Sequence, residues 1–249
     1  MKPNVVIAVT ARLAASLLPM AALLLPTAVA AGDRALADFI GYSEDGRYFA
    51  FEEYGIQDGS GFPYANIYVI DLPADAWVTG TPVRVQLESW EAELAVARAE
   101  AREQASGLLE DLGIDNPPHL IALNGDGEPG NGHTLEFGAV GYLPGELENE
   151  QRLSLEIFEA PSPNDCITYL GEEAKGYALL LEDDGAVREL HRDTGQLPES
   201  RGCPTTYRIY GVVARPDSGS LDDAVVIVSV YPFGFEGPDR RFLAVPLGD

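Results

Sequence analysis

The sequence has 249 residues, with 16 Lys and Arg against 40 Asp and Glu, and its formal net charge at pH 7 is −24. Such a charge argues against nucleic acid and anionic lipid surfaces as partners, because affinity for either begins with Lys and Arg displacing counterions. Cations, basic proteins and neutral glycans remain. High acidity is also a simple means of keeping an exported protein in solution.

Residues 1–30 have the pattern of a cleavable secretory signal peptide. Two basic residues and no acidic ones accompany an apolar stretch, as in such signals. An uncleaved membrane anchor is the alternative, but two prolines break the stretch, which falls short of the roughly 20 residues that a span requires. The small residues Ala28 and Ala30 predict cleavage after Ala30, and Val29 and Ala31 would allow it one residue later. We therefore expect one secreted domain over 31–249, in the periplasm or outside the cell, and not an integral membrane protein.

The start of the mature chain predicts three strands. Residues 39–54, FIGYSEDGRYFAFEEY, hold two aromatic segments around an Asp-Gly pair, which is the signal of a β-hairpin. A glycine-rich loop follows. NIYVIDL, at 66–72, is then a strand of β-branched and aromatic residues.

This segment resembles the middle of a β-propeller blade of the TolB-like periplasmic proteins, in which an aromatic-Ser-x-Asp-Gly turn joins two strands. A propeller needs several copies of the blade, and the only other partial match to this pattern is LLLEDDGAVREL, far downstream. A full propeller is therefore not expected. An Asp-Gly turn suits any twisted hairpin.

Glu53 is the carboxylate of greatest interest in the hairpin. It shares a face with Phe49 and Phe51, because alternate residues of a strand point the same way. If that face is buried, the carboxylate is either paired or has a shifted pKa. The simpler expectation is that the strand ends there and that Glu53 turns to water.

Residues 89–112 predict one amphipathic helix. Apolar residues recur at spacings of three and four, at Trp90, Leu94, Ala97, Ala101, Ala105, Leu108 and Leu112. Ser89 can cap the start and Gly113 the end. The alanines make the stripe narrow, so we expect the helix to pack closely on a sheet. A coiled coil is the alternative, but the repeat is short and consists mostly of alanine.

The second half of the chain predicts strands that are separated only by turns. NPPHLIALNGDGEPGNGHTLEF is expected to be a loop. The strand candidates that follow are 151–160, 175–182, 205–214, 224–233 and 240–247. Strand after strand beyond a single helix, without βαβ alternation, indicates a mainly β (α+β) fold with antiparallel sheets in a single domain.

The two cysteines, Cys166 and Cys203, are expected to form a disulfide. Export places both in an oxidising compartment, and neither has another partner in the chain. Two buried free thiols or an intermolecular bond are the alternatives. Prolines near both positions favour extended backbone, so no helix is expected at either cysteine.

No motif for catalysis or metal binding is found. Residues 124–133 are acidic and glycine-rich, as calcium loops are, but Pro129 lies where an EF-hand requires glycine. The three histidines share no metal-binding spacing, and no nucleophile motif occurs. We therefore assign no catalytic residue, metal ligand or cofactor. A triad whose members are dispersed along the chain would escape such an analysis.

Two glycine-rich loops carry the candidate binding residues. Phe62 and Tyr64 lie after the hairpin, and Phe233 and Phe235 lie before the last strand. Aromatic side chains on such loops are common binding elements. They are also common covers for the end of a β core, which is the alternative.

Several segments together resemble a bacterial family of predicted secreted proteins, domain of unknown function 2259. They are GYSEDGRYFAFEEYGIQDGSGFPYANIYVIDL, the helix with Ala97 and Arg98, SRGCPTTYRIYGVVA and GFEGPDRRFLAV. The resemblance covers nearly all of the mature chain. It implies export from a bacterium and a single domain, but no activity, ligand or site residue.

The preferred hypothesis is a non-enzymatic binding module for an envelope protein or glycan, acting through the aromatic loops and Glu53. One alternative is a hydrolase that uses Glu52, Glu53 or Asp58 near the hairpin. Another is a calcium-stabilised structural domain. The oligomeric state is left open.

Overall fold

The computed structural model describes residues 32–125, 131–144, 146–216 and 221–248. The predicted signal peptide at 1–30 lies outside these ranges, as do residues 126–130 of the acidic glycine-rich segment, so both expectations stay predictions. No helix in the described part of the chain is both long enough and apolar enough to cross a membrane.

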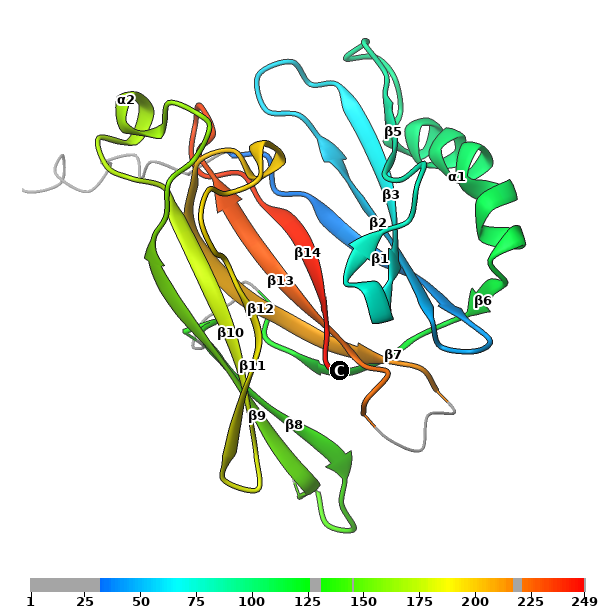
Figure 1. Cartoon of the computed structure of the whole chain (residues 1–249). Coiled ribbons are helices and arrows are strands. Elements are labelled where there is room, and N and C mark those ends of the chain that lie inside the picture. Colours follow the sequence, from blue (N-terminus) through cyan, green and yellow to red (C-terminus); the bar gives the residue numbers. More distant parts are fainter. Residues whose placement is uncertain (1–31, 126–130, 145, 217–220, 249) are drawn as a thin grey trace, which may run out of the picture. The chain divides into compact units, whose positions relative to one another are not determined.

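Three antiparallel sheets contain the described strands (Figure 1). The first, here called the N-terminal sheet, has the order β4-β3-β2-β1-β6, and β5 also pairs with β3. Its strands are β1 (Leu36–Ser43), β2 (Tyr48–Ile56), β3 (Pro63–Asp71), β4 (Ala76–Trp77), β5 (Val83–Gln86) and β6 (Ile114–Asn116). A short 3-10 helix, η1 (Leu72–Ala74), joins β3 to β4. The predicted hairpin is β1 and β2, and the third predicted strand is β3.

The central sheet has the order β14-β13-β12-β7, and the outer sheet has the order β11-β10-β9-β8. Their strands are β7 (His119–Leu123), β8 (Thr134–Val140), β9 (Leu147–Glu159), β10 (Lys175–Asp183), β11 (Ala186–Arg192), β12 (Pro204–Ala214), β13 (Val225–Pro232) and β14 (Arg241–Pro246). Two short helices connect them, α2 (Cys166–Leu170) before β10 and η2 (Glu199–Arg201) before β12. Every strand candidate of the second half forms a strand, which confirms the predicted antiparallel, mainly β fold.

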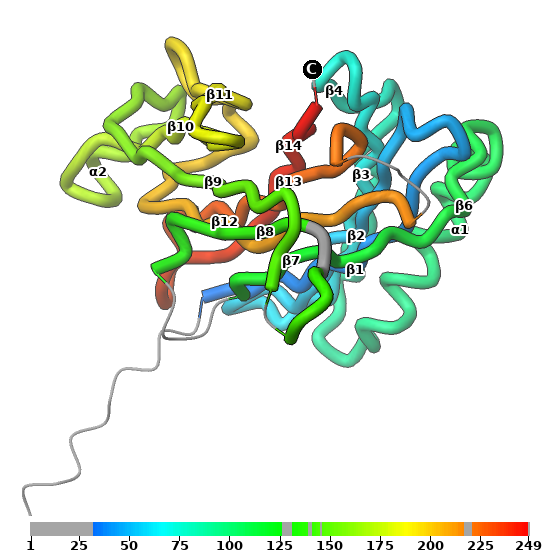
Figure 2. The backbone as a smooth tube through the Cα atoms, turned by 90° about the horizontal axis from the view of Figure 1, so that it is seen from below, coloured from blue at the N-terminus to red at the C-terminus, as the bar shows by residue number. Residues whose placement is uncertain are grey.

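The central sheet is covered on both faces. Apolar side chains that include Phe137, Leu179 and Val228 fill the space toward the outer sheet. A second cluster, with Phe51 and Ile227, fills the space toward the N-terminal sheet. Figure 2 shows β13 and β14 between β10 and β11 on one side and β3 on the other. β13 is buried along nearly its whole length, and its sequence, apolar except at Ser229, is typical of a strand that is covered on both faces.

Helix α1 (Leu94–Asp111) packs on the other face of the N-terminal sheet. The predicted alanine stripe is confirmed, since Ala97, Ala101 and Ala105 are all buried against that sheet. The predicted start is wrong, because the Ser89 hydroxyl accepts from the Glu91 N–H in a separate turn and the helix begins at Leu94. Trp90 therefore lies outside the helix and is exposed.

Two arginines of α1 form ion pairs with a buried carboxylate of the N-terminal sheet. Glu52 accepts hydrogen bonds from Arg98 at 2.8 and 2.9 Å and from Arg102 at 2.7 and 3.1 Å. Both arginines also reach Asp38 on β1, and the Arg98 guanidinium lies 3.8 Å from the centre of the Tyr54 ring. The helix is thus held by close alanine packing in the middle and by charge-assisted bonds at its side.

The predicted disulfide between Cys166 and Cys203 is present, with the Cα atoms 5.3 Å apart. Two local expectations are wrong. Cys166 begins helix α2, because Asp165 caps the Thr168 N–H and allows a helix to start after the prolines. The segment that was expected to be a loop contains β7 and the start of β8. β7 pairs with β12, far along the chain, so no local signal marks it.

Candidate functional site

The most suggestive concave surface runs along β14, the edge strand of the central sheet. Two adjoining pockets of about 370 Å³ and 280 Å³ lie beside it. We call them together the β14 groove, and the residues that line both pockets are Tyr68, Trp77, Ser200, Arg201, Phe242 and Leu243. One wall comes from β3 and β4, the other from β11 and η2, and β14 forms the floor.

The floor presents free backbone groups. The Leu247 N–H donates to the Ala224 carbonyl on the β13 side at 2.8 Å, whereas the Phe242 N–H donates away from β13, to Glu53, at 2.9 Å. Backbone groups of an edge strand alternate between its two sides. The N–H and C=O of Ala244 therefore face the groove. Pro246, the next residue on that side, has no N–H to offer.

Glu53 blocks strand pairing at one end of the β14 edge. Its side chain is 1% exposed, so the expectation that it turns to water is wrong. β2 continues to Ile56 through its pairing with β3. The carboxylate accepts from the Phe242 N–H and from the Asn66 amide at 3.3 Å, with Arg241 Nε 3.9 Å away. Burial raises its pKa.

Aromatic rings line both walls of the groove. On one wall, Trp77 is 47% exposed and meets Tyr68 edge to face at 5.5 Å between ring centres. On the other wall, His191 stacks on Tyr177 at 4.7 Å. The groove can therefore hold an apolar side chain between two aromatic surfaces.

The polar side chains of the second wall form hydrogen bonds and ion pairs with one another. Asp193 accepts from His191 at 3.2 Å and from Arg201 at 3.3 Å. Burial alone would raise the pKa of Asp193, but these two partners outweigh it, so the pKa is lowered. Ser200 lines the same groove, yet within the described residues no hydrogen bond joins it to His191. The arrangement lacks the nucleophile–base contact that acyl transfer uses.

The carboxylates of the hydrolase hypothesis do not converge. Glu52 and Glu53 are neighbours on a strand, so they point to opposite faces of the N-terminal sheet. Glu52 is engaged with α1 and Glu53 with β14. In the described ranges, no group of three His, Cys, Asp or Glu side chains is placed to hold a metal ion.

The four aromatic candidates lie in different surroundings. Tyr64 is buried and donates its hydroxyl to Asp33 at 3.0 Å, and Phe62 is half-buried. Phe233 is partly exposed and stacks on Tyr169 at 5.7 Å. Phe235 is 94% exposed. Tyr64 thus supports the fold, while the other three keep exposed surface; none of the four lines the β14 groove.

The groove residues themselves were not singled out from the sequence. Trp77, His191 and Ala244 come from three distant segments, and no spacing relates them. The one usable signal is that β14 carries a proline, Pro246, which is typical of an edge strand. Glu53 is the only sequence candidate that lines the groove.

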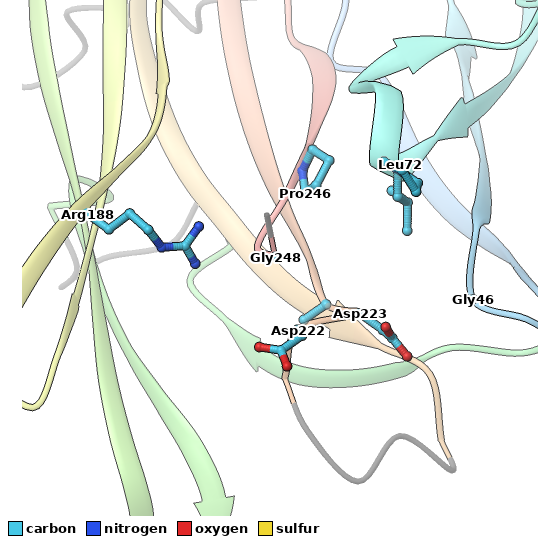
Figure 3. Close-up of a pocket in the computed structure, with 9 residues that line it drawn as sticks. Gly46, Leu72, Arg188, Asp222, Asp223, Pro246 and Gly248 are labelled. Atoms are coloured by element: carbon cyan, nitrogen blue, oxygen red, sulfur yellow. The ribbon is translucent and has the colours of Figure 1, made fainter.

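A larger pocket of about 450 Å³ lies beyond the groove, at the end of β14. Figure 3 shows Arg188 of β11 on one side and Leu72 of η1 on the other, with Pro246 between them. Its charged groups are already engaged: Arg188 donates to the Leu247 carbonyl at 2.6 Å, and Asp223 pairs with Arg215 at 2.7 Å. The β14 groove, with its free backbone groups, is therefore the better candidate.

Comparison with curated proteins returned no match. A family model described as "Predicted secreted protein (DUF2259)" matches residues 50–247. The match spans most of the chain and includes the strands that form the groove. The chain therefore belongs to the DUF2259 family of predicted secreted proteins.

Proposed function

We propose that this protein is an exported binding module that takes up an extended peptide segment of another envelope protein in the β14 groove. The observation that carries the proposal is the outward-facing N–H and C=O of Ala244 on an edge strand with a wall on each side. An extended peptide that pairs with such an edge gains main-chain hydrogen bonds, and pockets for alternate side chains supply selectivity.

The walls suit that mode of binding. A peptide strand points alternate side chains to opposite faces, and here one face meets Trp77 and the other meets His191. The larger groove pocket, of about 370 Å³, has the size of a pocket for one or two side chains. An apolar or aromatic side chain fits these surfaces best.

Both ends of the open edge are blocked, which limits the length of the pairing. Glu53 occupies the Phe242 N–H, and Pro246 has none. Natural sheets use inward-pointing charges and prolines in this way to prevent edge-to-edge aggregation. The window around Ala244 therefore accepts a short peptide strand and discourages pairing with a second sheet.

A glycan is the second candidate, because aromatic walls also stack on sugars. Free backbone groups at strand spacing favour the peptide. The matching pair in a peptide strand is the N–H and the C=O of a single residue, which point to the same side of the strand.

The export part of the proposal rests on the pattern of residues 1–30 and on the family. We expect the mature chain, in the periplasm or in the medium, to begin at Ala31 or Gly32. The intact mass of protein recovered from those fractions tests this, and recovery of the full-length chain would overturn it.

A defined peptide pool tests the binding. The probe is a pool of acetylated, amidated hexapeptides with Val, Thr or Tyr at alternate positions, titrated into the mature protein while the backbone amide signals of the strands around the groove are followed by NMR. Ala244→Pro removes only the N–H that faces the groove, which an edge strand tolerates. Loss of this bond should weaken binding roughly tenfold, since a tenfold change equals about 1.4 kcal/mol.

Ala244→Ser is the matched control, because it keeps the N–H and should bind like the wild type. If Ala244→Pro unfolds, Trp77→Ala replaces it, since its side chain is partly exposed and its loss should still weaken binding. Unchanged binding in the tested variant, or binding of chito-oligosaccharides in place of peptides, would overturn the proposal.

A further inference from the structure

The β14 groove continues past Glu53 into a third pocket of about 240 Å³. The residues that line both this pocket and its neighbour are Asn66, Arg84 and Arg241. Gln57 and Gln86 add two further amides to the lining. Tyr64 and Val85 complete the lining, so this end of the groove adds amide and guanidinium groups to aromatic and aliphatic surface.

The charge of this end is opposite to that of the chain. Of the charged side chains that line the two pockets, Arg84, Arg201 and Arg241 are basic and only Glu53 is acidic. The whole chain, by comparison, has a net charge of −24. A local basic lining in so acidic a protein selects a ligand group that is itself negative.

Arg84 differs from the other two arginines in its surroundings. Arg241 pairs with Asp33 at 2.8 Å, and Arg201 pairs with Asp193 at 3.3 Å. Arg84 lies exposed on β5, and within the described residues it makes no hydrogen bond or ion pair. Its guanidinium is thus available for a planar, two-oxygen acceptor.

The direction in which a peptide strand pairs with β14 determines which end of the peptide lies near Arg84. All strands of the central sheet pair antiparallel, and antiparallel addition to β14 would bring the carboxyl end of a peptide toward Arg241. Pairing cannot continue beyond this point, because Glu53 already occupies the Phe242 N–H. A bound strand must therefore stop or turn beside Arg84.

We infer that Arg84, with the neighbouring amides, binds the C-terminal carboxylate of the peptide held in the β14 groove. The inference rests on the proposed function and deepens it. The groove would then recognise the free end of a partner chain, with an apolar or aromatic residue a few positions before the carboxylate.

Three peptide pools test the inference. All share the sequences of the pool described above. The first ends in a free carboxylate, the second in a carboxamide, and the third in a carboxamide preceded by Glu. We expect the wild type to bind the first pool roughly three- to tenfold more tightly than the second, as a partly exposed arginine–carboxylate pair allows. The NMR signal of the Arg84 Nε–H should shift only with the first pool.

Variants separate this inference from the proposed function. Arg84→Gln should abolish the preference and leave the affinity for the carboxamide pool unchanged, and Arg84→Lys should keep part of it. Arg152→Gln makes the same change of charge on exposed β9, away from the groove, and should keep the full preference.

Equal binding of the first two pools by the wild type, or a preference that survives in Arg84→Gln, would overturn the inference and leave the proposed function standing. Equal binding of the first and third pools would assign Arg84 to an acidic side chain and overturn the chain-end assignment. Failure of the wild type to bind the carboxamide pool would count against the proposed function itself.

Discussion

Glu52 and Glu53 are neighbours on β2 and both are almost fully buried, but their pKa values shift in opposite directions. Glu52 faces α1 and accepts four hydrogen bonds from Arg98 and Arg102. Burial alone would raise its pKa, but the two arginines outweigh burial and lower it. Glu53 faces β14, with one backbone N–H and one amide as its hydrogen-bond partners, and burial raises its pKa.

The difference shows that burial does not by itself set the charge of a side chain. The number and distance of cationic partners decide it. On the Glu52 side the interface is closed by a helix. On the Glu53 side the carboxylate borders a groove and caps an edge strand. One side therefore serves stability, and the other leaves room for a ligand.

The largest effect is expected from removing the disulfide, whose Cys203 lies close to the groove wall formed by η2. Cys166→Ala with Cys203→Ala opens a loop whose ends lie 37 residues apart, and the free energy of unfolding should fall by about 4 kcal/mol. Urea denaturation measures this loss. Amide exchange through local opening should rise most around Ser200 and Arg201 in the groove wall and less in α1. A loss below about 1 kcal/mol would contradict the prediction.

Glu52→Ala should have the next largest effect, on the helix side. Removing one partner of a buried ion pair costs about 3–5 kcal/mol. Arg98 and Arg102 can still reach water, since their side chains are 28% and 44% exposed, so we expect about 3 kcal/mol. Glu100→Ala, on the exposed face of α1, is the control and should change stability by less than about 0.5 kcal/mol. Similar losses of stability in Glu52→Ala and Glu100→Ala would refute the stabilising role of the ion pairs that Glu52 makes with α1.

The pH dependence of Glu52→Gln and Glu53→Gln should have opposite signs. The folded pKa of Glu52 lies below its ordinary value of 4.5, so its contribution is present above that pH and is lost as the pH falls. The folded pKa of Glu53 lies above 4.5, so its ionisation removes stability as the pH rises.

Relative to the wild type, Glu52→Gln should therefore be most destabilised near pH 7 and less so near pH 3. The stability of Glu53→Gln relative to the wild type should increase between pH 4 and pH 7. Urea midpoints across this range measure both. Parallel curves for the two variants would mean that the partners do not set the charge states as described.

Trp77→Ala should have the smallest effect on stability. The side chain is half-exposed and contacts mainly Tyr68, so we expect a loss of about 1 kcal/mol or less, which thermal unfolding can measure. Peptide binding should fall far more than stability. A stability loss above about 3 kcal/mol would show that Trp77 belongs to the core and not to a binding wall.

Much of the fold was determined by local sequence. The hairpin of β1 and β2, the alanine stripe of α1 and the strands of the second half follow from periodicity and turn residues that act over a few positions. The pairing of Cys166 with Cys203 followed from parity and compartment. β7 and α2 were missed, because β7 needs a partner far along the chain and α2 depends on a single cap at Asp165.

The candidate site was decided almost entirely by tertiary structure. A strand's own sequence does not state whether it lies at a sheet edge, because that depends on which strands pair with it, and β14 became an edge only through the order of the central sheet. Glu53 was visible as a carboxylate on an aromatic face, but its partner, the Phe242 N–H, lies 189 positions away. Trp77, His191 and Ala244 meet because the packing of three sheets brings distant segments together, and contacts of that kind leave no local pattern in a sequence.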